Sequence, residues 1–212
     1  MTINKIKVCG ITDLSIANFC IENGADYLGF VSYNDSPRNI SFHESKNIIN
    51  QLSSPINTVA VTVNANIDDA KEIEDAGFNF IQCHGSETPD YLSIIKKTTS
   101  LKIIKAFGVS SQNDLINISK YNEFCDFFLM DAKPEGSEMP GGNAKQFNWN
   151  LLRDQNINKQ FFLSGGLDED NIEIAIKNNI TSLFDVSSSV ESSPGVKDTL
   201  KIKKFIDKVR SK

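Results

Sequence analysis

Short apolar runs alternate with amphipathic segments of helical length along this chain, and that alternation constrains its fold more than any other feature. Apolar residues recur at helical spacing in 43–52, 68–76, 89–97, 112–121, 168–178 and 198–209. Alternation of strands and helices is typical of a parallel sheet covered by helices. The apolar runs with the length of buried strands are 5–9, 27–31, 58–63, 78–83, 101–107, 124–130, 160–163 and 182–186.

Eight strand-like runs in 212 residues, most of them followed by a segment of helical length, predict an α/β protein. The expected fold is a compact (β/α)8 TIM barrel of eight parallel strands. We expect a single domain over residues 1–212, because no linker or low-complexity segment interrupts the pattern. The first helix is expected to start at Thr12-Asp13, whose side-chain oxygens can cap the residues that follow. A doubly wound open sheet has the same periodicity and is the structural alternative.

Charge and cysteine content exclude several classes of partner and site. The formal net charge is −5 with no long basic run, which argues against nucleic acid and anionic membranes as partners. No apolar run approaches the roughly 18 residues of a membrane-spanning helix, and no signal-peptide core follows the N-terminus. The four cysteines are scattered without a Cys-x-x-Cys pair, so we expect neither disulfides nor a zinc site, and a cytoplasmic location.

The first strand-like run ends in a lysine and a cysteine that face the same way. Lys7 and Cys9 are two residues apart, and side chains alternate along a strand. A cation beside a thiol favours the reactive thiolate, so this pair is a candidate for catalysis. The alternative is that Cys9 is a small buried core residue, as most free cysteines are.

Other polar residues stand at the ends of later strands, where a barrel places its active site. Asp131 and Asp185 each close an apolar run, and each is either catalytic or a helix cap. Arg38 follows Pro37 and could hold a carboxylate through two parallel hydrogen bonds, or be a solvated surface arginine. His84 is an acid–base candidate, but a structural role is favoured, because the second histidine alone cannot complete a three-histidine metal site.

Two further stretches have the composition of phosphate-binding loops. Residues 163–167 read Leu-Ser-Gly-Gly-Leu after the seventh run, and 187–195 read Ser-Ser-Ser-Val-Glu-Ser-Ser-Pro-Gly after the eighth. Glycine lets backbone N–H groups approach an anion, and barrels often bind phosphate with these two loops. The alternative is that both are ordinary turns, but their position after the seventh and eighth strands favours a phosphate site.

Taken together, these motifs resemble the phosphoribosylanthranilate isomerase family. The resemblance spans the chain and implies a TIM barrel of the ribulose-phosphate-binding type. It also implies an Amadori rearrangement in tryptophan biosynthesis, without cofactor or metal, on a phosphorylated small molecule, by a monomer or homodimer. The motifs that carry it are residues 7–12, 28–31, 36–38, 81–85, 128–132, 163–167 and 185–198.

Roles for individual residues follow from the same resemblance. Cys9 matches the family's general base and Asp131 its general acid, while Arg38 is expected to hold the anthranilate carboxylate. We expect Lys7, His84 and Asp185 to contribute to substrate binding. The phosphate is expected on the backbone of Gly165, Gly166, Ser188 and Ser189.

The chain departs from the family pattern at two places. Ser189 stands where glycine is usual, and a positive φ there would strain a serine. Asn143-Ala144 replaces the usual Thr-Gly in the loop after the sixth strand. These changes leave room for two alternatives, another phosphosugar barrel enzyme or a non-catalytic barrel that binds a phosphorylated metabolite.

Overall fold

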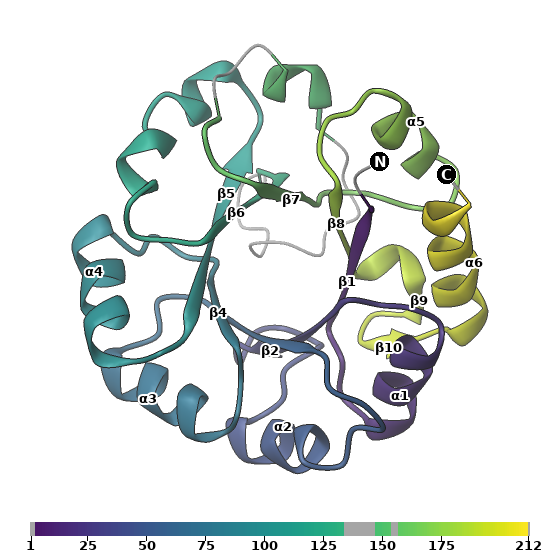
Figure 1. The fold of residues 1–212 in the computed structure, drawn as a ribbon, viewed down its shortest axis with the longest axis horizontal. Coiled ribbons are helices and arrows are strands. Elements are labelled where there is room, and N and C mark those ends of the chain that lie inside the picture. Colours follow the sequence, from purple (N-terminus) through teal and green to yellow (C-terminus); the bar gives the residue numbers. More distant parts are fainter. Residues whose placement is uncertain (1–2, 134–146, 154–156, 212) are drawn as a thin grey trace.

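Eight parallel strands close into a barrel in the order in which they occur in the chain (Figure 1). The computed structural model describes residues 3–133, 147–153 and 157–211. Closure is made by pairing of the first and last strands, so the predicted TIM barrel is confirmed and the open sheet is wrong. The strands are β1 (Lys5–Cys9), β2 (Tyr27–Ser32), β3 (Asn57–Thr62), β4 (Phe80–Cys83), β5 (Lys102–Val109), β6 (Phe127–Ala132), β7 (Phe161–Leu163) and β8 (Leu183–Val186).

The α-helices form a ring outside this barrel (Figure 1). Asp13 caps the first of them as predicted, because its carboxylate accepts a hydrogen bond from the Ile16 N–H at 2.9 Å. Across the described ranges, no helix is long and apolar enough to cross a membrane. The helices are α1 (Leu14–Glu22), α2 (Phe42–Ile49), α3 (Ile67–Asp75), α4 (Pro89–Thr98), α5 (Ile172–Lys177) and α6 (Thr199–Arg210).

The predicted helix over 112–121 is wrong. Two short 3₁₀ helices, η1 (Gln112–Leu115) and η2 (Ile118–Tyr121), occupy this stretch between β5 and β6. It is rich in Asn, Asp and Ser, whose side chains compete for backbone groups and favour turns over continuous helix. Asp114, for example, accepts hydrogen bonds from the N–H groups of Ser110 and Ser111 at 3.0 and 2.9 Å.

The hydrophobic core has two layers, one inside the barrel and one between the barrel and its helices. Aromatic rings pack together in the inner layer: Tyr27 lies edge-on against Phe80 and Phe162, with ring centroids 5.7 and 5.1 Å apart. Side chains on a strand alternate between the two layers. Polar residues near the carboxyl ends of several strands, among them Cys9, Asp131 and Asp185, line a pocket beside this inner layer.

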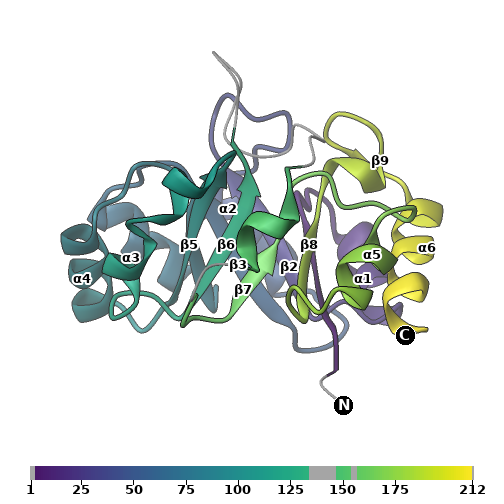
Figure 2. The same cartoon turned by 90° about the horizontal axis from the view of Figure 1, so that it is seen from above.

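A short antiparallel hairpin lies between β8 and α6, at the end of the barrel where the strands finish (Figure 2). It consists of β9 (Glu191–Ser193) and β10 (Val196–Lys197) and follows the 3₁₀ helix η4 (Ser188–Val190). Its turn residue Gly195 has φ +84° and lies against the Pro37 carbonyl, where a side chain would clash. The hairpin is thereby placed over the β2–α2 loop that carries Arg38.

Candidate active site

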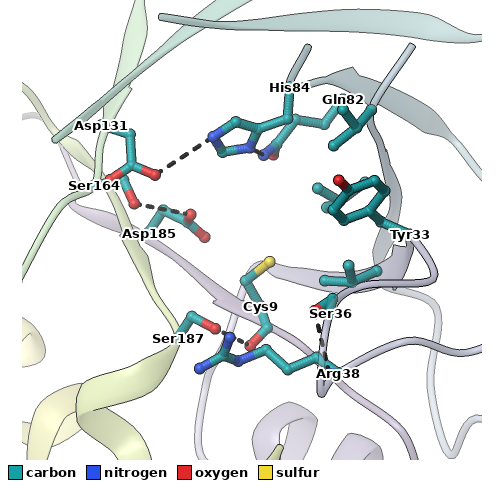
Figure 3. Close-up of a pocket in the computed structure, with 13 residues that line it drawn as sticks. Cys9, Tyr33, Ser36, Arg38, Gln82, His84, Asp131, Ser164, Asp185 and Ser187 are labelled. Carbon is teal, nitrogen blue, oxygen red and sulfur yellow. Dashed lines mark hydrogen bonds and ion pairs between the residues drawn. The ribbon is translucent and has the colours of Figure 1, made fainter. Parts of the chain in front are cut away.

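The polar residues predicted from the strand ends line one pocket (Figure 3). The thiol, both carboxylates, the imidazole and the guanidinium all contribute to its wall, and Lys7 lies buried on the strand that carries Cys9. Within the described residues, no three His, Cys, Asp or Glu side chains are placed to hold a metal ion. The lining side chains discussed below are Cys9, Arg38, Gln82, His84, Asp131, Ser164, Asp185 and Ser187.

Lys7 and Asp185 form a buried ion pair at the bottom of the pocket. They are register partners on β1 and β8, and Lys7 Nζ lies 2.9 Å from Asp185 Oδ1. Burial alone would lower the pKa of Lys7, but the charges and hydrogen bonds of Asp185 and Cys9 together outweigh it, so the pKa of Lys7 is raised. The ammonium therefore stays protonated.

The Cys9 sulfur lies beside this ion pair, in space that a glycine leaves open. A Cβ atom on Gly29 would lie 2.8 Å from Cys9 Sγ and 3.1 Å from Lys7 Nζ. Burial raises the pKa of the Cys9 thiol, and Asp185 adds to the rise, while Lys7 and Lys197 oppose it without cancelling it. The Lys7 ammonium thus does not bring the pKa of Cys9 below its ordinary value, because burial of the thiol outweighs it.

Asp185 also faces the seventh strand. Burial raises the pKa of its carboxyl group, and Lys7 opposes this rise. Its second oxygen, Oδ2, accepts a hydrogen bond from Ser164 Oγ at 3.3 Å. Asp185 thus links the cation beneath the pocket to a hydroxyl on the pocket wall.

Asp131 is the last but one residue of β6 and faces the imidazole of His84. Its Oδ2 lies 3.4 Å from His84 Nε2, and its Oδ1 accepts a hydrogen bond from the Ala132 N–H at 2.8 Å. Gly165 packs against this carboxylate: a Cβ atom there would lie 3.1 Å from Asp131 Oδ1 and 2.7 Å from the Ala132 nitrogen. Asp131 caps no described helix, and its side chain points into the pocket (Figure 3).

Gln82 lines the pocket, although it was not predicted as a site residue from the sequence. Its amide Nε2 lies 3.0 Å from His84 Nδ1, on the side of the imidazole away from Asp131. The signal was present in the sequence, because Gln82 precedes His84 by two positions and so shares its face of the strand. A single glutamine inside an apolar run nevertheless matches no functional motif, so the sequence alone did not indicate a role for it.

Arg38 is buried, so the reading of a solvated surface arginine is wrong. Its Nε and Nη2 donate to the two carboxylate oxygens of Glu191 at 2.8 and 2.7 Å. Lys197 Nζ also donates to Glu191, at 2.6 Å. Burial alone would raise the pKa of Glu191, but the two cations outweigh it, and its pKa is lowered. Glu191 and Lys197 were missed as site residues, although both lie in the 185–198 motif.

The two predicted phosphate loops lie side by side after β7 and β8. Gly165 and Gly166 have φ values of +77° and +70°, which glycine adopts readily. Ser189 is not among the non-glycine residues with positive φ, so the expected strain there is absent. Its hydroxyl donates to the Leu167 carbonyl and joins the loops. In the described part of the chain, no acceptor contacts the N–H groups of Gly166, Ser188 or Ser189. Asn143-Ala144 lies outside the described residues.

The closed barrel, with its polar pocket at the carboxyl ends of the strands, has the architecture of a TIM-barrel enzyme. A model of the N-(5′-phosphoribosyl)anthranilate (PRA) isomerase family matches residues 6–208. The chain belongs to that family, and it is an isomerase of tryptophan biosynthesis.

Relatives and solved structures agree over nearly the full length. The N-(5′-phosphoribosyl)anthranilate isomerase of Petrotoga mobilis is 39% identical over 208 residues, covering 98% of this chain and 97% of that protein. The crystal structure of phosphoribosyl anthranilate isomerase from Thermotoga maritima has a TM-score of 0.88 at 34% identity, covering 99% of this chain and all of that one. A phosphoribosyl anthranilate isomerase in complex with reduced 1-(o-carboxyphenylamino)-1-deoxyribulose 5-phosphate has a TM-score of 0.86 at 32% identity, with the same coverage.

Proposed function

We propose that Asp131 and Cys9 are the general acid and general base with which this isomerase converts N-(5′-phosphoribosyl)anthranilate into 1-(2-carboxyphenylamino)-1-deoxyribulose 5-phosphate. The observation that carries the proposal is their placement in one pocket. Cys9 ends β1 and Asp131 lies near the end of β6, with two strands between them one way round the barrel and four the other. A sugar bound between them would present opposite sides to the two groups (Figure 3).

Asp131 acts first, by giving a proton to the ribose ring oxygen. The bond from this oxygen to C1′ breaks as the amine nitrogen's lone pair forms a C1′=N iminium. The carboxylate left on Asp131 is stabilised by the Ala132 N–H, already 2.8 Å from Oδ1. His84 Nε2, at 3.4 Å from Oδ2, supplies a second donor when it carries a hydrogen.

Cys9 then removes the proton from C2′. The iminium acts as an electron sink, so the electrons of the C2′–H bond form an enolamine, which tautomerises to the ketone. In the unliganded protein burial raises the pKa of this thiol, so its neutral form predominates near pH 7. The iminium cation beside it and the ammonium of Lys7 both favour the thiolate. Cys9 needs no covalent bond to substrate in this scheme.

Arg38 and the two loops would fix the ends of the substrate. The guanidinium retains donors beyond the two held by Glu191, and it lines the pocket, so it can bind the anthranilate carboxylate. The N–H groups of Gly165, Gly166, Ser188 and Ser189 would bind the phosphate. The Lys7–Asp185 pair and Ser164 lie between these ends, where they can orient the sugar hydroxyls and the amine.

We also place the protein in the cytoplasm, as a monomer or homodimer. Support for the compartment comes from its cysteines, all four of which are free thiols that a reducing environment keeps unpaired.

The test combines genetic complementation with purified variants. The wild-type gene should restore growth without tryptophan to a strain lacking only this isomerase. Cys9→Ala and Asp131→Asn should fail to do so and lose at least about a hundred-fold in kcat. Cys20→Ala, at a buried thiol in α1, and Asp126→Asn, before the start of β6, are matched controls expected to complement.

Two outcomes would contradict the proposal. Near-normal turnover in either catalytic variant would overturn the acid–base assignment. Failure of folded wild-type protein to complement would instead favour the alternative of a non-catalytic barrel that binds a phosphorylated metabolite.

A further inference from the structure

Gln82 carries a buried polar atom that the described residues leave without a partner. The residue is 1% exposed and lines the pocket next to His84. Its Nε2 is hydrogen-bonded to the imidazole, but within the described ranges Oε1 has no donor. A buried amide oxygen without a hydrogen bond is costly, and such an atom in a pocket wall points to a ligand that supplies the donor.

We propose that Gln82 has two functions in this site, which rest on the proposed role of Asp131 as the acid. With Nε2 it is a positioning residue, because it fixes the imidazole of His84 in the form that donates to Asp131. With Oε1 it is a substrate contact, because it accepts a hydrogen bond from an N–H or O–H group at the reacting end of the substrate.

The positioning function follows from the geometry of the imidazole. A neutral histidine has one protonated ring nitrogen, and the other accepts. The Gln82 amide donates to Nδ1, so Nδ1 is the acceptor and the hydrogen lies on Nε2. Nε2 faces Asp131 Oδ2 at 3.4 Å. The chain of donors therefore runs from Gln82 on β4 through His84 to Asp131 on β6.

This chain of hydrogen bonds matters when Asp131 has released its proton. The carboxylate then has two donors, the Ala132 N–H on Oδ1 and the His84 Nε2–H on Oδ2. The carboxyl group of Asp185 on β8 also lies close enough to Asp131 to interact with it electrostatically. Lys7 compensates the charge of Asp185. With the opposite tautomer, a lone pair of Nε2 would face the carboxylate and oppose the acid step.

The substrate-contact function follows from the neighbours of Gln82 on the inner face of the barrel. Its register partners are Val61 on β3 and Ile104 on β5, both apolar and unable to donate to Oε1. An amide oxygen accepts from hydroxyl and amine groups and is repelled by anions. The carboxylate and phosphate of the substrate must then lie elsewhere, as they do if Arg38 and the loops after β7 and β8 bind them. The sugar hydroxyls and the bridging N–H remain as donors for Gln82.

The first experiment reads the tautomer of His84 directly, by ¹⁵N–¹H NMR of ligand-free protein labelled at histidine. The chain has two histidines, and His43 is exposed on α2, which makes it an internal reference that His43→Gln assigns. Wild-type His84 should show protonated Nε2 and unprotonated Nδ1 near pH 8. Gln82→Met, which has neither donor nor acceptor, should shift His84 to a mixture of tautomers. A wild-type His84 protonated at Nδ1 alone would overturn the positioning function.

The second experiment separates the two functions by kinetics. Gln82→Met should lower kcat and raise KM, with kcat/KM falling by roughly ten-fold or more. Gln82→Glu keeps an oxygen acceptor but removes the donor to Nδ1, so KM should return towards the wild-type value while kcat stays low. Gln51→Met, at an exposed glutamine whose amide donates to the Asn47 carbonyl, is the matched control and should leave both parameters unchanged.

The outcomes distinguish this proposal from the assignment of the acid. Wild-type kinetics in Gln82→Met, with the protein folded by circular dichroism, would overturn both functions of Gln82. Wild-type kcat in Gln82→Glu would overturn the positioning function alone. Retained turnover in Asp131→Asn would overturn the acid assignment, and the NMR spectrum would still report whether Gln82 sets the tautomer of His84.

Discussion

Arg38 and Glu191 form a two-point ion pair that joins the β2–α2 loop to the β9–β10 hairpin. The guanidinium donates to both carboxylate oxygens, at 2.8 and 2.7 Å, and both side chains are more than nine-tenths buried. The two residues are 153 positions apart in the chain. The two parallel hydrogen bonds hold the guanidinium plane in one orientation. The N–H groups that Glu191 does not bind therefore stay directed at the pocket.

Glu191→Gln tests whether this pair orients the substrate anchor. A glutamine accepts only one of the two hydrogen bonds and leaves Arg38 buried with an incomplete partner. We expect a loss of about 3 kcal/mol in the free energy of unfolding, and a KM raised roughly ten-fold with a smaller change in kcat. Urea denaturation and steady-state kinetics measure the two effects.

The matched control is Lys201→Met. Lys201 Nζ donates to the backbone carbonyl of Glu191 at 2.7 Å, so this change touches the same hairpin but leaves the carboxylate intact. KM should stay at the wild-type value. Equal KM values for Glu191→Gln and wild type would show that Arg38 needs no such support to bind substrate.

Much of the fold could be predicted from the sequence because it depends on local patterns. Eight apolar runs were enough to place Cys9 and Asp131 at the carboxyl ends of their strands. The helix over 112–121 could not be excluded in the same way. Its apolar spacing is helical, and only its Asn, Asp and Ser content indicates the turns found there.

The site was predicted less completely, because its partners come from segments distant in the chain. The pairing of Lys7 with Asp185, for example, depends on β1 pairing with β8 when the barrel closes. Glu191 could not be assigned to Arg38 before the hairpin was placed over the β2–α2 loop. The burial that raises the pKa of Cys9 likewise results from packing of the whole barrel, so no short sequence motif could reveal it.

Lys7→Met should destabilise the protein in a pH-dependent way. Burial already raises the pKa of Asp185, and removal of the ammonium raises it further. The folded protein then binds this proton more tightly than the unfolded chain, so stability is retained at low pH and lost as pH rises through the folded pKa. We expect a loss of about 3–5 kcal/mol near pH 8 and a smaller one near pH 5. Adding Asp185→Asn should remove most of the pH dependence, and an equal loss at both pH values would contradict the ion pair.

The raised pKa of Cys9 predicts the pH profile of catalysis. If the thiolate is the base, the ionised fraction of the free enzyme limits kcat/KM, which should rise with pH and level off above about 8.5, the ordinary thiol pKa. The profile is measured between pH 6 and 10 with the wild-type enzyme. A plateau reached well below that pKa would mean that the thiol is already ionised in the free protein, or that another group is the base.

Gly165→Ala should impair catalysis by crowding the acid. Gly165 has φ +77°, and a Cβ atom there would lie 2.7 Å from the Ala132 nitrogen and 3.1 Å from Asp131 Oδ1. The new methyl group has to displace the end of β6, which would weaken the hydrogen bond from the Ala132 N–H to the carboxylate. We expect a fall of roughly ten-fold or more in kcat and a loss of about 1–2 kcal/mol in stability from the left-handed backbone.

Gly24→Ala separates these two effects. Gly24 also has a positive φ, +96°, but the nearest atom to its Cβ would be Arg210 Nε at 3.7 Å, an ordinary contact. It lies after α1, at the end of the barrel away from the pocket. The stability loss should therefore be similar and kcat unchanged. If both variants kept wild-type kcat, the position of the Asp131 carboxylate would not depend on Gly165, and the contact between them would have no part in turnover.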